Sequence, residues 1–145
     1  MKLSNSLTAT TRVIFFQVRD PMAKLKKICE TAQSHFEKRD SLLILVEDER
    51  AEKFVDELLW KLPETSFLPH AIATLPTSEK IAITRVKKNL NEARIAFNLC
   101  PTPLSIDGPF KIIYELEDLT APSKQKFSVL RFDAYKKMGF PIEAR

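Results

Sequence analysis

Two aspartates stand where a metal ion could be held. Asp20 and Asp48 each follow a run of apolar residues that is typical of a buried strand. If these strands are neighbours in a parallel sheet, both carboxylates lie at one edge and suit a two-metal, magnesium-dependent nuclease. Each aspartate also precedes an expected helix, where its side chain can cap the first turn. We expect capping, and the metal-dependent nuclease is kept as the alternative.

Other catalytic groups do not form a recognisable set. A phosphate-binding loop needs glycines close to the phosphates, and Gly108 and Gly139 stand in no such motif. His35 and His70 are tied to no serine or cysteine nucleophile by any motif, and we expect both to be structural. The cysteines are far apart and belong to no zinc-binding pattern. We therefore predict no enzymatic activity, no metal and no cofactor.

Trp60 lies opposite the apolar face of the helix that is expected to follow the strand at residues 42–46. At about 100° per residue, one face of this helix is apolar, and Trp60 lies about 170° from its centre. Phe67 follows in the loop. Either a neighbouring element covers Trp60, or Trp60 and Phe67 form a docking hot spot for another protein. The apolar face comprises Ala51, Phe54, Val55, Leu58, Leu59 and Leu62.

The expected C-terminal helix, about residues 123–138, shows a similar conflict. Its predicted core stripe is Phe127, Leu130, Ala134 and Met138. Phe132 and Val129 project away from this stripe, beside Gln125 and Lys136. An apolar spot rimmed by amines suits a peptide that ends in an aromatic residue and has acidic flanks. The alternative is that Phe132 packs sideways against the margin of the core.

The elements that must position these residues alternate between strand and helix. Two successive strand–helix units predict right-handed crossovers and a mostly parallel sheet in a three-layer α/β fold. Residues 110–116 are expected to be the last strand, and a helix ended by Gly139 is expected to close the chain. The predicted strands cover residues 12–18, 42–46, 70–75, 80–85, 94–99 and 110–116.

Composition narrows the function classes. The 145 residues are expected to form one domain, 1–145, with a flexible N-terminus at about 1–10. No signal peptide or membrane span is evident, which predicts a soluble cytoplasmic protein. The net charge of +4 permits weak attraction to nucleic acid. The lysines are dispersed, so a direct DNA-binding module is only an alternative.

Two segments resemble one protein family. ILVEDERAEKFVDELLWKLPETSFLPH combines a strand, an acidic turn, a Leu-Trp pair near a helix end and a Ser-Phe-x-Pro-His loop, and RFDAYKKMGF adds an aromatic, basic C-terminal pattern. Both resemble the chi subunit of the bacterial DNA polymerase III holoenzyme. The resemblance implies a Rossmann-like fold without nucleotide binding, no catalysis and no cofactor. It implies a replication adaptor that reaches nucleic acid only indirectly.

The resemblance also implies partners. Trp60 and Phe67 match the aromatic pair that contacts the psi subunit of the clamp loader, or a competing helicase. The acidic, phenylalanine-ended tail of single-stranded DNA-binding protein is the other partner, expected at Phe132, Val129, Lys124, Lys126, Arg131 and Lys136. Phe132 replaces the family's tyrosine, Asp133 and Val129 replace basic residues, and Gln125 replaces a lysine. We expect tail binding that is weak and salt-sensitive.

Overall fold

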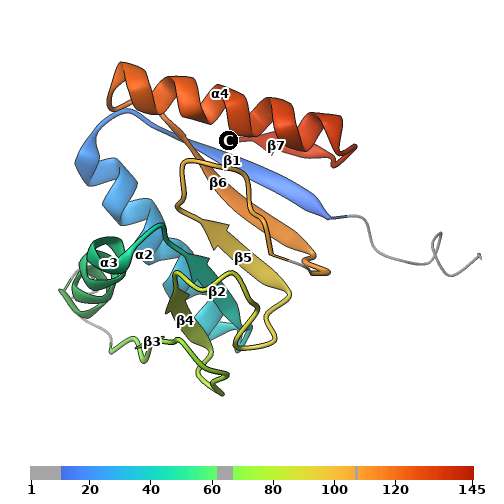
Figure 1. Ribbon diagram of the computed structural model, residues 1–145. Helices are drawn as coiled ribbons and strands as arrows, with labels where there is room; N and C mark the ends of the chain where they lie inside the picture. The colour runs from blue at the N-terminus through green and yellow to red at the C-terminus, as the bar shows by residue number, and fades with distance from the viewer. Residues whose placement is uncertain (1–10, 62–66, 107) are drawn as a thin grey trace, which may run out of the picture.

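Within residues 11–61, 67–106 and 108–145, which the computed structural model describes, seven parallel strands form one sheet (Figure 1). The strand order is β3-β4-β2-β5-β6-β1-β7. The expected flexible segment 1–10, together with Leu62 and Ser66, lies outside the described residues. The elements in chain order are β1 (Arg12–Val18), α2 (Pro21–Glu37), β2 (Leu42–Leu45), α3 (Glu49–Lys61), β3 (Ala71–Ile72), β4 (Ile81–Thr84), β5 (Ile95–Asn98), β6 (Ile112–Asp118), α4 (Pro122–Lys137) and β7 (Ile142–Ala144).

Two apolar clusters cover the two faces of the sheet. Alternate residues of each strand point to opposite faces, so Ile14 packs under α2 and α3 whereas Phe15 packs under α4. The segments 86–93 and 100–106 complete the layer that contains α4. The result is the predicted three-layer, Rossmann-like α/β fold. No helix in the described part of the chain is long and apolar enough to cross a membrane.

The expected strands are present, but one expectation about the sheet is wrong, and the condition for the nuclease alternative is not met. The chain does not close with a helix, because β7 follows α4 and pairs with β1. Strands β1 and β2 are not neighbours, because β5 and β6 lie between them. Asp20 and Asp48 therefore follow strands that are separated in the sheet. This order removes the premise of a shared two-metal site.

The predicted core face of α3 is partly wrong. Val55, Leu58 and Leu59 are buried as expected, whereas the Phe54 residue is 55% exposed. Glu52 is buried in its place, and its carboxylate accepts a hydrogen bond from the backbone N–H of Arg85. The helix is thus rotated relative to the predicted orientation, so that Glu52 faces the core and Phe54 faces outward. The buried carboxylate is tolerated because the backbone N–H that follows β4 donates a hydrogen bond to it.

The predicted core stripe of α4 is wrong. Phe127, Leu130 and Met138 are exposed, and Ser128, Arg131 and Tyr135 face the sheet instead. The Ser128 hydroxyl donates to the backbone carbonyl of Lys124, as hydroxyls in helices commonly do. Apolar side chains occur on several sides of this helix, so their spacing could not identify the buried face. Hydrogen-bond partners in the sheet determine which face of α4 is buried.

Candidate functional site: an aromatic patch and a cleft at the sheet edge

The aromatic pair predicted from the sequence lies on the surface and is in contact. Trp60 is 48% exposed and Phe67 is 71% exposed. Their ring centroids are 5.3 Å apart, at the end of α3 and in the segment that leads to β3. Contiguous exposed aromatics of this size are unusual on a surface that only meets water. We call Trp60 and Phe67 the aromatic patch.

A buried histidine supports this patch from below. The His70 ring centroid is 4.1 Å from that of Trp60. The Nδ1 atom of His70 lies 2.7 Å from the carbonyl oxygen of Leu68, and Nε2 lies 3.1 Å from the carbonyl oxygen of Asp56. These contacts join α3 to the start of β3 and hold the imidazole in one orientation. His70 is structural, as expected. The histidine of the Ser-Phe-x-Pro-His loop links the backbone of this loop to α3.

The residues expected to bind the acidic tail do not share one face of α4. Phe132 is 37% exposed, because its ring packs 5.6 Å from Phe15 of β1. Val129 and Lys136 are exposed. About 100° per residue places these two residues on the same flank as Phe132. We call Val129, Phe132 and Lys136 the outer flank of α4.

Arg131 does not offer a free positive charge, so that expectation is corrected. Its Nε donates to a carboxylate oxygen of Glu115 at 2.8 Å, and both side chains are buried. The same carboxylate accepts hydrogen bonds from Asn98 at 2.7 Å and Tyr135 at 2.6 Å. Burial raises the pKa of Glu115 to about 7, against the opposing pull of these donors. The network anchors α4 on β6.

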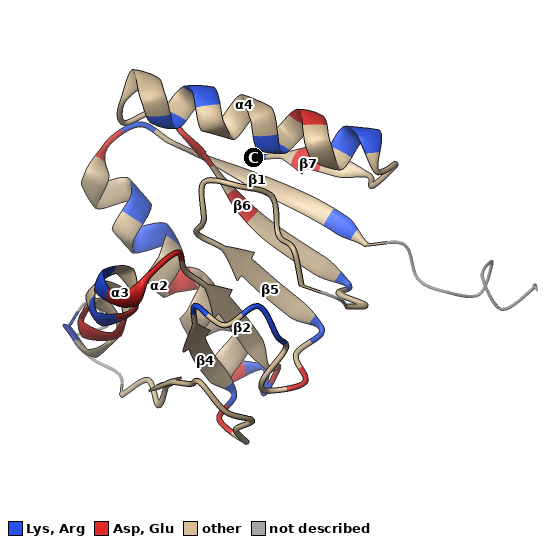
Figure 2. Ribbon diagram, in the orientation of Figure 1, with Lys and Arg blue, Asp and Glu red and all other residues tan. Residues whose placement is uncertain are grey.

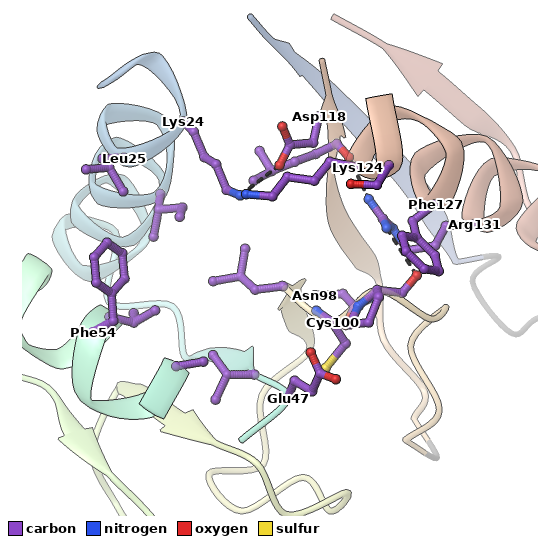
Figure 3. Close-up of a pocket in the computed structure, with 18 residues that line it drawn as sticks. Lys24, Leu25, Glu47, Phe54, Asn98, Cys100, Asp118, Lys124, Phe127 and Arg131 are labelled. Carbon is purple, nitrogen blue, oxygen red and sulfur yellow. Dashed lines mark hydrogen bonds and ion pairs between the residues drawn. The ribbon is translucent and has the colours of Figure 1, made fainter. Parts of the chain in front are cut away.

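Lys124, another residue expected to bind the tail, lines a cleft on the other side of α4. The cleft has a volume of about 540 Å³ and opens at the carboxyl ends of β5 and β6, between α2, α3 and α4. Phe54 and Phe127 lie on opposite walls (Figure 3). In parallel α/β sheets this edge is where ligands commonly bind. Sequence analysis missed the cleft because both phenylalanines were assigned to the core.

The two candidate metal ligands cap helices. An oxygen of Asp20 accepts a hydrogen bond from the N–H of Ala23 at 2.9 Å, and Asp48 accepts one from Ala51 at the same distance. No group of three or more potential metal-ligating side chains occurs among the residues that the structure covers. Both aspartates therefore have the capping role that was expected of them.

Comparison with known proteins agrees with the segments singled out above. The family described as DNA polymerase III chi subunit, HolC, matches residues 10–143. A relative from Pseudomonas aeruginosa, named DNA polymerase III subunit chi, is 23% identical over 135 residues, which cover 92% of this chain and 94% of that protein. The match to the family extends from β1 into β7 and includes both the aromatic patch and the cleft. This chain is a member of the DNA polymerase III chi subunit family.

Proposed function

We propose that this protein is a non-catalytic adaptor of the replicative polymerase, acting in the cytoplasm. The aromatic patch binds the psi subunit of the clamp loader, or a helicase in its place. Helix α4 and its surroundings bind the acidic tail of single-stranded DNA-binding protein. The protein thereby connects the polymerase machinery to coated single strands and contacts DNA only through that partner.

One observation carries the proposal, namely the exposed contact between Trp60 and Phe67. Two large aromatic rings held together at a surface provide apolar area without much loss of side-chain entropy on binding. The buried His70 below them keeps Trp60 in place before the partner arrives. An interface of this kind needs no catalytic group. The capping roles of Asp20 and Asp48 remove support for the nuclease alternative.

Trp60→Ala tests the proposal. We expect it to weaken binding of the psi subunit or the helicase of the same organism by about 2 kcal/mol or more, as measured by calorimetric titration. Because Trp60 is half exposed, the free energy of unfolding in urea should change by less than about 1 kcal/mol. An unfolding loss of about 3–5 kcal/mol, typical of a core truncation, would contradict the docking role.

Phe54→Ala is the matched control for this experiment. Phe54 is an aromatic residue of the same helix with a similar exposed fraction, 55% against 48% for Trp60. It lines the cleft instead of the aromatic patch. The control should bind psi or the helicase with unchanged affinity. Equal losses for both variants would mean that the whole of α3, and not the aromatic patch, determines binding.

A further inference from the structure

The imidazole of His70 lies between oxygen atoms that can only accept hydrogen bonds. Its Nδ1 atom is 2.7 Å from the carbonyl oxygen of Leu68. Its Nε2 atom is 3.1 Å from the carbonyl oxygen of Asp56 and 3.1 Å from a carboxylate oxygen of the same residue. A neutral imidazole has one N–H, so one of its nitrogens would direct a lone pair at an oxygen. An imidazolium has two N–H groups and donates on both sides, which makes it the form that these contacts satisfy.

His35, the other histidine of the chain, is also buried but has different neighbours. Its Nδ1 atom lies 3.2 Å from a carboxylate oxygen of Asp40, and its Nε2 atom lies 2.8 Å from the hydroxyl of Tyr114. A hydroxyl can donate as well as accept a hydrogen bond. A neutral His35 therefore satisfies both contacts, because Nδ1 donates to Asp40 while Nε2 accepts from Tyr114. The surroundings of the two histidines thus favour different charges.

A charge on His70 has both a counter-ion and an aromatic partner. The carboxylate of Asp56 is partly exposed to water, whereas the His70 side chain is buried. The indole of Trp60 lies on the imidazole, with 4.1 Å between the ring centroids. A cation at this distance from an indole is attracted by the electrons of the ring. A buried charge is costly unless it is paired, and both interactions offset that cost here.

The other charged side chains around His70 are distant from it or paired with one another. β3 contacts α3 and β4. The described segment 67–78, which contains His70 and β3, has no lysine, arginine or acid, and β4 has none either (Figure 2). Arg50 lies in the first turn of α3, at the opposite end from Trp60. Asp56 is thus the counter-ion that the described residues provide. The remaining charged residues of α3 form pairs of their own, namely Lys53 with Glu49, Lys61 with Glu57, and Glu52 with Arg85.

We infer that His70 is a buried imidazolium that keeps the Trp60 indole in place by a cation–π contact, so that loss of its proton loosens the aromatic patch. Without the second proton, one ring nitrogen faces an oxygen with no hydrogen between them, and the charge against the indole is lost. His70 is therefore a positioning residue that acts through its charge as well as its shape. The effect on partner binding rests on the proposed function, whereas the charge of His70 does not.

Nitrogen NMR of the isolated, untagged chain tests the charge. With isotope-labelled histidine at pH 7, both ring nitrogens of His70 should give the signals of protonated nitrogen. His35 should give one protonated and one unprotonated signal, as a neutral ring does. The chain has two histidines, so either His70→Gln or His35→Gln is enough to assign the signals. An unprotonated nitrogen on His70 at this pH overturns the inference.

Tryptophan fluorescence tests the contact between the charge and the indole. Trp60 is the single tryptophan of the chain, so the intrinsic emission reports on it alone. A protonated imidazole in contact with an indole quenches its emission. At pH 6, wild type and His35→Gln should therefore be dimmer than His70→Gln. If wild type is as bright as His70→Gln at this pH, the charge does not act on Trp60 and the positioning role is wrong.

Calorimetric titration of the psi subunit or the helicase from the same organism connects the charge to docking. Wild type should bind about two- to fivefold more tightly at pH 6 than at pH 8, as expected from the loss of a cation–π contact. The same ratio in His70→Gln corrects for titration of the partner, and the preference for pH 6 should be absent there. His35→Gln should keep the wild-type ratio.

The outcomes separate this inference from the proposed function. If wild type and His70→Gln show the same ratio while Trp60→Ala still abolishes docking, the proposed function stands and the role of the His70 charge in docking is wrong. If NMR shows the imidazolium and its quenching of Trp60 but neither partner binds, the charge and its contact with the indole are confirmed. The proposed function then fails.

Discussion

The indole of Trp60 rests on the imidazole of His70, with 4.1 Å between the ring centroids. His70 is buried, and both of its ring nitrogens lie within hydrogen-bond distance of backbone oxygens. Trp60 therefore packs against a side chain that is itself held in one orientation. A docking surface that is ordered before binding loses less entropy when the partner arrives.

His70→Ala should damage both stability and partner binding. The substitution leaves the carbonyl oxygens of Leu68 and Asp56 without the imidazole and removes the support below Trp60. Loss of these buried contacts should lower the free energy of unfolding by about 1–3 kcal/mol in a urea titration. Binding of psi or the helicase should weaken as well, even under conditions in which the variant is fully folded.

His35→Ala is the control for that prediction. His35 is also buried, and its ring nitrogens lie near the Tyr114 hydroxyl at 2.8 Å and an Asp40 carboxylate oxygen at 3.2 Å. It is a residue of α2, and within the described structure its ring contacts Tyr114 and neither Trp60 nor Phe67. It should lose a comparable amount of stability and keep its affinity for the partner. If both histidine variants lose the partner equally, the support role of His70 is disproved.

The Glu115 network predicts a pH dependence of stability. Burial raises the pKa of this carboxyl from 4.5 to about 7 in the folded protein. Between these pH values the folded state holds the proton more tightly than the unfolded state, so stability falls as the pH rises. The fall attributable to this group amounts to about 3 kcal/mol across the window. Urea titrations at pH 5 and pH 8 measure it. The lowered pKa of Asp118 acts at more acid pH.

Glu115→Gln tests whether Glu115 is the group that causes this pH dependence of stability. The amide cannot titrate, so the pH-dependent fall should be absent in the variant. At pH 5, where the wild-type carboxyl carries a proton, the variant should be less stable by about 1–3 kcal/mol, because an amide nitrogen cannot accept the hydrogen bonds that one Glu115 oxygen accepts from Asn98 and Tyr135. A wild-type slope that persists unchanged in Glu115→Gln would assign the pH dependence to other groups.

Asp20→Ala and Asp48→Ala should behave as losses of helix caps. Each removes one hydrogen bond to a backbone N–H and should cost about 1 kcal/mol of unfolding free energy. We expect no magnesium-dependent cleavage of DNA or RNA by wild type in a gel assay. Cleavage that survives stringent purification and disappears in Asp48→Ala would restore the nuclease hypothesis.

The two thiols should react slowly with alkylating reagents. Burial raises the pKa of both Cys29 and Cys100 to about 11 from 9.0, so little thiolate is present at neutral pH. Iodoacetamide at pH 7.5 should modify both far more slowly than it modifies a free cysteine, as followed by mass spectrometry. Addition of urea should remove the difference. Rapid modification of Cys29 in the native protein would contradict its burial in the core.

The sequence alone was sufficient for the order of most elements. Long apolar runs predicted strands at residues 12–18 and 42–46 because strands covered on both faces need apolar side chains throughout. Asp20 and Pro21 marked the start of α2, and Gly139, at φ +82°, follows the end of α4. These signals are local, so they hold whatever the neighbours are. The three-residue β7 was missed because it is too short for a periodic pattern.

Helical spacing was enough to place Trp60 outside the core, because α3 is strongly amphipathic and one tryptophan stood apart from its apolar face. Its contacts with Phe67 and His70 depend on how the segment after α3 returns to β3. The same spacing failed for α4. Glu115, an acid that directly follows and precedes apolar or aromatic residues of a predicted strand, was the available signal that this helix would bury a polar face.

Only the tertiary structure decided the strand order, the buried face of α4 and the existence of the cleft. Strand order depends on how segments that are distant in the sequence pair with one another. Here it places two strands between those that precede Asp20 and Asp48. Glu115, buried on the interior strand β6, takes Arg131 and Tyr135 as hydrogen-bond partners, since a buried carboxylate must be satisfied. That requirement outweighs the apolar stripe, rotates Phe127 outward, and places it across a hollow from Phe54.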